Sequence, residues 1–153
     1  MDKKQTYELL CKQITSLLGD ETDCLANMAN LSAALFQELP DLNWAGFYIL
    51  KDGQLVLGPF QGKPACVRIA LGRGVCGTCA RSGQTQLVKN VHEFAGHIAC
   101  DAASNSEIVL PIFKNGAVWG VLDIDSPILA RFDETDKIYL EKIARLFEKT
   151  SAL

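Results

Sequence analysis

The sequence predicts an α+β domain, in which a central antiparallel β-sheet has helices against one face and long loops over a pocket on the other. Two observations support this fold class. Apolar residues recur at helical spacing near both ends of the chain. Between them, two pairs of apolar segments are joined by the turn dipeptides Asp52-Gly53 and Asn115-Gly116. Tight turns of this kind join antiparallel strands, and helices packed on one face of the sheet would bury its apolar side chains.

The helices are expected at the two ends of the chain. Apolar positions with a period near 3.6 cover residues 7–18 and 25–39, and the acidic pair Asp20-Glu21 suits the start of the second helix. A terminal helix is expected to begin within residues 132–136, because its apolar residues then share one face: Leu140, Ile143, Leu146 and Phe147.

Two hairpins account for the strands that the pattern predicts. The first pairs residues 44–50 with 54–57, and the second pairs residues 107–113 with 117–124. The segment from 59 to 106 is rich in Gly, Cys and His and is expected to be irregular, apart from a short helix after Gly74. Long irregular segments of this kind usually carry function.

Composition narrows the class of protein. With 153 residues, 48% of them hydrophobic, the chain is expected to form one domain over residues 1–153 that needs no metal or disulfide for stability. Neither a signal peptide nor a membrane span is predicted, so a cytoplasmic location is expected, where the six cysteines would be free thiols unless they cycle in catalysis. A net charge of -3 predicts no binding to nucleic acid or to a membrane.

One spacing imitates a zinc finger. The pattern C-x2-C-x12-H-x4-H is met by Cys76, Cys79, His92 and His97. A finger of this type needs an aromatic and an aliphatic residue in the spacer to form its core, whereas Gly83 and Lys89 occupy those places. No metal site is therefore predicted.

The same cysteines also form the C-x-x-C motif Cys76-Gly77-Thr78-Cys79. A thioredoxin-like reading would require a preceding parallel strand, but the strands predicted here are paired in hairpins. For Cys79 a structural role, as a small buried apolar residue, is favoured over a redox role.

A cysteine and three acids form the most suggestive group. Cys100 lies in a glycine-led loop, and it is followed by Glu107, Asp123 and Asp125. The two aspartates alternate along one strand, so they share a sheet face, and Glu107 opens the neighbouring strand. Crowded carboxyl groups raise one another's pKa, so at least one is expected to hold a proton near neutral pH. The alternative is that they are solvated charges at strand ends.

A thiol beside a protonated carboxyl suits the reduction of a sulfoxide. An acid that donates to the sulfoxide oxygen makes the sulfur electrophilic enough for a cysteine to attack. The cysteine becomes a sulfenic acid, which condenses with a nearby thiol to a disulfide that an external dithiol can reduce. Cys66 and Cys76 are the candidates for the second thiol.

The chain resembles the free methionine-(R)-sulfoxide reductases, which are single GAF domains of about this length. The resemblance spans nearly the whole chain, and the combination of its motifs is much more specific than any one of them. It rests on residues 43–48, residues 58–62 with Cys66, residues 72–77, residues 96–101 with Ser104, Ser106 and Glu107, and residues 120–126.

The resemblance implies a role for each of the matching residues. Cys100 would be the nucleophile, Cys66 the principal resolving thiol and Cys76 a possible alternative to it. Glu107, Asp123 and Asp125 would polarise the sulfoxide or bind the substrate ammonium. Trp44 and Tyr48 would form walls of the pocket. Backbone N–H groups around Ile98, Ala99 and Cys100 would bind the substrate carboxylate.

The resemblance also implies partners. The substrate would be free methionine-(R)-sulfoxide, thioredoxin would reduce the disulfide, no cofactor would be needed, and the protein would be a homodimer, formed through its terminal helices. The alternative function is that of a GAF sensor or binding module without catalysis. A third reading, a zinc-dependent structural protein, rests on the Cys/His spacing alone.

Overall fold

The computed structural model describes residues 1–97 and 102–153. Four α-helices and one short 3₁₀ helix lie in this part of the chain: α1 (Lys3–Leu18), α2 (Cys24–Glu38), α3 (Gly74–Ser82), η1 (Val91–Glu93) and α4 (Glu134–Thr150). The strands described are β1 (Trp44–Lys51), β2 (Gln54–Gly62), β3 (Arg68–Ala70), β4 (Gln86–Val88), β5 (Ser106–Lys114) and β6 (Ala117–Ser126).

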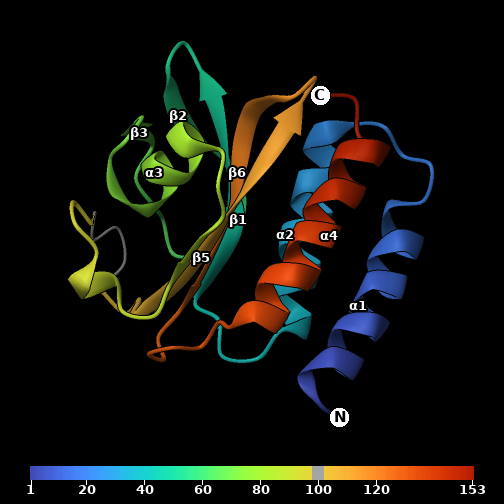
Figure 1. Ribbon diagram of the computed structural model, residues 1–153. Helices are drawn as coiled ribbons and strands as arrows, with labels where there is room; N and C mark the ends of the chain where they lie inside the picture. The colour runs from blue at the N-terminus through green and yellow to red at the C-terminus, as the bar shows by residue number, and fades with distance from the viewer. Residues whose placement is uncertain (98–101) are drawn as a thin grey trace.

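The strands form one antiparallel sheet in the order β3-β2-β1-β6-β5-β4. Helices α2 and α4 cover one face of this sheet, and α1 packs on both of them as an outer layer (Figure 1). Helix α3 and the connecting loops lie on the opposite face (Figure 1). The predicted α+β fold class is thereby confirmed, including the placement of the terminal helices on one face.

Both predicted hairpins are present. The turn residues Asp52 and Gly53 have φ of 51° and 80°, and Asn115 and Gly116 have φ of 53° and 78°. Positive φ at both central positions is the type I′ geometry, whose twist matches that of the paired strands. The first hairpin is longer than the sequence predicted, because β2 continues past residue 57 to Gly62.

Aspartate side chains fix the starts of the long helices. Asp2 and Asp133 form capping boxes at α1 and α4, and Asp23 accepts a hydrogen bond from the backbone N–H of Ala26 at α2. The predicted helices therefore exist, with α2 beginning just after the acidic stretch that was expected to mark its start.

The segment expected to be irregular contains more structure than the pattern indicated. The short helix after Gly74 is confirmed as α3, but β3, β4 and η1 were missed. Each is three residues long, which is too short for a hydrophobic period to appear. Strands β3 and β4 exist because β2 and β5 supply their hydrogen-bond partners.

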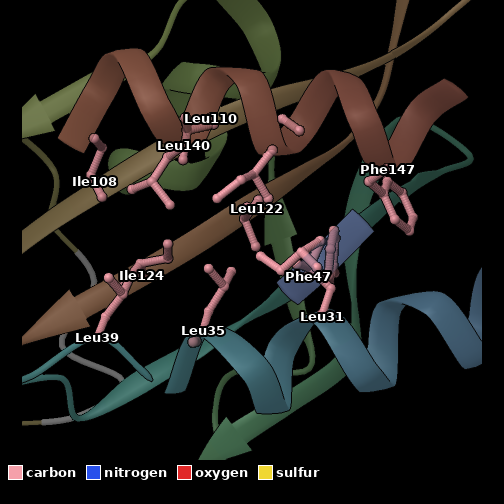
Figure 2. Packing of buried hydrophobic residues seen from close by; sticks show 14 of the residues in the cluster. Leu31, Leu35, Leu39, Phe47, Ile108, Leu110, Leu122, Ile124, Leu140 and Phe147 are labelled. Atoms are coloured by element: carbon pink, nitrogen blue, oxygen red, sulfur yellow. The ribbon is translucent and has the colours of Figure 1, made fainter. Parts of the chain in front are cut away.

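Two clusters of buried apolar side chains lie on the two faces of the sheet. On the helical face, Phe47 and Leu122 meet Leu35 of α2 and Phe147 of α4 (Figure 2). On the other face a second cluster joins β1, β5 and β6 to α3. No helix in the described part of the chain is both long and apolar enough to cross a membrane.

Candidate active site

Strand register brings the three acids together on the α3 face of the sheet. Asp125 lies directly opposite Trp44 on one side and Glu107 on the other, and Asp123 is paired with Gly46 of β1 in the same way. All three carboxylates line one pocket. Only 8% of Glu107 and 5% of Asp123 is exposed. The prediction that the acids converge is confirmed, whereas the alternative of solvated strand-end charges is wrong for Glu107 and Asp123.

Burial changes the acidity of this group. Desolvation, reinforced by the charges of Asp123 and Asp125, raises the pKa of Glu107 well above its ordinary value. Oδ1 of Asp123 is buried and has no hydrogen-bond partner among residues 1–97 and 102–153. The pocket therefore contains a carboxyl group that holds its proton at a higher pH than an ordinary glutamate, beside an Asp123 oxygen that is available to a ligand.

Aromatic side chains form another wall of the pocket. Trp44 and Tyr48 are four residues apart on β1, so their side chains lie on the same face as the acids. The indole of Trp44 stacks on Phe60 at 5.1 Å and on Tyr48 at 6.0 Å between ring centroids. Both aromatic residues expected to line the pocket do so.

The pocket lies between the sheet, the start of α3 and two loops. Besides the acids and the two aromatic residues it is lined by Pro64, Ala65, Ile69, Arg73, Gly74, Val75, Cys76, His97 and Ser104. The sequence patterns predicted no role for Arg73, His97 or Ser104. They come from loops or a helix end, so no periodic pattern marked them, although all three stand within the motifs that carry the family resemblance.

The cysteines differ in state. Cys66 is disulfide-bonded, and it is one of the cysteines that were expected to cycle between thiol and disulfide. Free thiols are found at Cys11, Cys24, Cys76 and Cys79. Of the residues expected in the site, Ile98, Ala99 and Cys100 lie outside the described residues, and the roles expected of them stay predictions.

Cys76 is buried next to the acids. Its Sγ–H group donates to Oε2 of Glu107 at 3.9 Å. Desolvation, with the nearby charges of Asp123 and Glu107, raises the pKa of Cys76 well above that of an ordinary thiol. Because the thiolate is the reactive form, this position disfavours nucleophilic attack by Cys76.

Two residues of the zinc-finger spacing, Cys79 and His92, have other partners. Cys79 is buried with its Sγ–H directed at the carbonyl oxygen of Val109, and burial raises its pKa to about 12. The His92 Nε2 atom lies 2.8 Å from Oδ1 of Asn105. Across the described residues, the potential ligand atoms that gather within 4.8 Å of one another belong to Cys76, Glu107 and Asp123. That set is different from the finger pattern.

Comparison with known proteins identifies close relatives. A GAF-domain family model matches residues 26–148. The free methionine-R-sulfoxide reductase of Escherichia coli (strain K12) is 53% identical over 152 residues, covering 99% of this chain and 92% of that protein.

Solved structures of free methionine-R-sulfoxide reductases are also similar to this chain. The free methionine-R-sulfoxide reductase from Neisseria meningitidis in complex with its substrate has a TM-score of 0.95 and 47% identity, covering 98% of this chain and 90% of that one. The reduced form of fRMsr of Staphylococcus aureus has a TM-score of 0.92 and 55% identity, covering 94% of each chain.

Proposed function

The chain belongs to the free methionine-R-sulfoxide reductases of the GAF-domain family, and on that premise we propose that it reduces free L-methionine-(R)-sulfoxide to methionine with its own cysteine thiols. The observation that carries the proposal is the buried carboxyl of Glu107, held among two further acids in a pocket with an aromatic wall. A proton donor beside an apolar surface is what a methyl sulfoxide requires.

Glu107 is the proton donor in this scheme. Its raised pKa keeps the acid form present at a higher pH than in an ordinary glutamate, and donation to the sulfoxide oxygen makes the substrate sulfur electrophilic. Asp123 and Asp125 are assigned to the α-ammonium of the amino acid, because three carboxylates are more than one sulfoxide oxygen needs. The ammonium would supply the partner that the buried Oδ1 of Asp123 needs.

The remaining contacts orient the substrate. The indole of Trp44 contacts the methyl group of the sulfoxide, and Tyr48 extends this apolar wall. Backbone N–H groups of Ile98 and Ala99 bind the substrate carboxylate, an assignment that rests on the family resemblance.

Cys100 is the proposed nucleophile. The sulfoxide oxygen passes from the substrate sulfur to the Cys100 sulfur, which leaves methionine and a Cys100 sulfenic acid. The Cys66 thiol then attacks the sulfenic sulfur, a disulfide forms, and the hydroxyl leaves as water with the thiol proton. The disulfide at Cys66 supports this resolving role, and the buried Cys76, with its raised pKa, is the less suitable partner.

Recycling needs two electrons and two protons from outside the chain. We assign this step to thioredoxin in the cytoplasm, and we propose that no cofactor takes part. Cys66 is half-buried and precedes the exposed Val67, so the disulfide lies near the surface where a dithiol protein can approach.

The protein is further proposed to be one GAF domain that forms a homodimer through its terminal helices. Exposed apolar side chains on these helices support this assembly: Leu9, Leu17, Leu25 and Ile138. Sedimentation velocity on wild type and on Leu9→Glu is the test, with a wild-type dimer that weakens in the variant as the expected result.

A substrate comparison tests the function. Free R-sulfoxide, free S-sulfoxide and N-acetylated, amidated R-sulfoxide are incubated at equal concentration with the protein and a thioredoxin system, and methionine or its blocked form is measured. We expect turnover of the free R form alone, because blocking removes the ammonium that pairs with buried carboxylates. Comparable turnover of the blocked compound would refute the ammonium site, and binding of the free R form without turnover would indicate a sensor module.

A further inference from the structure

Cys66 lies in a segment that has no secondary structure of its own. Residues 63–67 connect β2 to β3, since β2 ends at Gly62 and β3 begins at Arg68. Lys63, Pro64 and Val67 are exposed, whereas Cys66 is half-buried. The position of the Cys66 sulfur therefore depends on contacts that the segment makes with the rest of the protein.

Two hydrogen bonds from the pocket wall fasten this segment. The indole Nε1–H of Trp44 donates to the carbonyl oxygen of Lys63 at 3.1 Å. The phenol of Tyr48 donates to the carbonyl oxygen of Cys66 itself at 2.7 Å. One bond holds the start of the segment, and the other holds the residue that carries the sulfur.

Both donors are rigid. Trp44 and Tyr48 lie on β1, which is paired with β2 on one side and β6 on the other. Their exposed fractions are 3% and 2%, and their rings stack on each other. Side chains packed in this way have lost their rotamer freedom on folding, so they hold a hydrogen-bond partner in place without a further entropy cost.

From this geometry we propose that Tyr48 and Trp44 are positioning residues for the disulfide step, because their hydrogen bonds hold residues 63–66 where the Cys66 thiol can react. Their action is on the segment and is additional to their place in the pocket wall. This role rests on the proposed function, in which formation of the disulfide resolves the sulfenic acid. Disulfide formation at Cys66 can nevertheless be measured without any substrate.

The expected change in the equilibrium constant for disulfide formation at Cys66 can be given a size. In the exchange between reduced protein and oxidised glutathione, the two protein thiols become one disulfide and two molecules of glutathione thiol are released. Loss of one of these bonds leaves the segment held less tightly, which lowers the effective concentration of the Cys66 thiol, so the protein disulfide becomes easier to reduce. The loss of one hydrogen bond of this kind corresponds to a factor of about two to ten in the equilibrium constant.

The test is the redox equilibrium of wild type, Tyr48→Phe and Trp44→Phe in glutathione buffers, with thiols counted by alkylation and mass measurement. Tyr48→Phe keeps the ring and removes the hydroxyl, and Trp44→Phe keeps an aromatic side chain and removes the N–H. We expect each to lower the constant for disulfide formation at Cys66 by about threefold or more. An unchanged constant in Tyr48→Phe would overturn the inference.

Tyr7→Phe is the matched control. It removes the same hydroxyl from a buried tyrosine, but its partner is Asp136 in the helical layer, on the other face of the sheet from the cluster that contains Cys66. We expect it to lower the melting temperature and to leave the redox equilibrium unchanged. A shift equal to that of Tyr48→Phe would show a general effect of destabilisation and would also overturn the inference.

Turnover gives a second readout that separates this inference from the proposed function. In wild type, release of one methionine per chain and closure of the disulfide are followed after mixing with free R-sulfoxide. In Tyr48→Phe the ratio of the closure rate to the release rate is expected to fall about threefold or more. Absence of methionine release in wild type would contradict the proposed function, while an unchanged ratio would contradict the positioning role alone.

Discussion

Burial has opposite consequences for two neighbouring residues of the site. It raises the pKa of Glu107 well above its ordinary value, which suits this carboxyl to the proposed role of proton donor. It also raises the pKa of Cys76 well above that of an ordinary thiol, which favours the protonated and less nucleophilic form. Burial favours the neutral form of both groups. A neutral carboxyl group can donate a proton, whereas a neutral thiol is a poor nucleophile.

Glu107→Gln is expected to lower kcat about 100-fold or more, because the amide cannot supply the proton. The dependence of kcat on pH tests the role of Glu107 more directly than the loss of activity does. The acid form is present below the Glu107 pKa and is lost as pH rises through it, so wild-type activity should fall on the alkaline side of that raised pKa. The variant should lack this fall. Glu93→Gln, at an exposed glutamate of η1, is the control and should match wild type.

The thermal stability of Glu107→Gln shows whether a loss of activity in this variant is a chemical defect or a folding defect. Because the folded-state pKa of Glu107 is raised, wild type loses stability as pH rises from the unfolded-state pKa to the folded one. Glutamine has no such dependence. We expect its melting temperature at neutral pH to equal or exceed that of wild type, and a large decrease would argue against Glu107 as a group that is protonated in the fold.

Cys66→Ser and Cys76→Ser should separate the two candidates for the resolving thiol. With Cys66→Ser, we expect one methionine per chain in a single turnover and a strong loss of thioredoxin-dependent cycling, because attack by Cys100 does not need Cys66 but disulfide formation does. Cys76→Ser should cycle within about threefold of wild type. Cys79→Ala is the matched control on α3. If the Cys76 variant lost recycling instead, the two roles would be exchanged.

At the scale of elements, the site depends on how closely β1 and β2 approach. The register between them shifts between Gly46 and Tyr48, at a β-bulge. A Cβ atom at Gly46 would clash with Cβ of Phe60, whose ring stacks on Trp44. Glycine at position 46 therefore allows the aromatic wall to form beside Asp123, the residue on β6 that is paired with Gly46.

Gly46→Ala is accordingly expected to destabilise the fold by about 1–3 kcal/mol and to displace the Trp44–Phe60 pair, which should raise KM more than it lowers kcat. Gly58→Ala on β2 is the comparison, since its nearest contact would be 3.1 Å to the carbonyl oxygen of Phe47, which is tight but less severe than the contact at Gly46. Chemical denaturation and steady-state kinetics measure both effects. Equal losses at the two glycines would mean that the Phe60 contact is not decisive.

At the scale of the whole molecule, one buried carboxylate ties the N-terminal helix to the C-terminal helix. Asp136 of α4 is fully buried and accepts hydrogen bonds from the Tyr7 hydroxyl at 2.6 Å and from Lys3 Nζ at 2.7 Å. Arg131 contributes a third contact at 3.3 Å. Helix α1 is an outer layer, so this polar link complements the apolar contacts that fasten it.

Asp136→Asn is expected to lower the free energy of unfolding by about 3 kcal/mol, because it removes the charge that compensates two cations at a buried position. The exposed pair Lys4–Glu8 provides the control, and Glu8→Gln should change stability by less than about 0.5 kcal/mol. Denaturant titration measures both. Folded Asp136→Asn protein should keep its kcat, and a matching loss of kcat would show that the helical layer affects the pocket.

The sequence by itself determined the features that local patterns encode. Apolar periods predicted the terminal helices, and Asp52-Gly53 and Asn115-Gly116 predicted the hairpins, because positive φ at two successive positions is a local requirement. Alternation placed Asp123 and Asp125 on one face for the same local reason. The matching motifs indicated the family before any geometry was known.

Only the tertiary structure decided what depends on distances between residues far apart in the chain. Strands β3 and β4 exist through pairing with β2 and β5, and no local pattern marks a three-residue strand. The raised pKa of Glu107 results from desolvation and from acids on a neighbouring strand. The bond from Tyr48 to the carbonyl of Cys66 joins a side chain to a main-chain oxygen, which any residue carries. Such an acceptor has no sequence signature, so folding alone brings the two together.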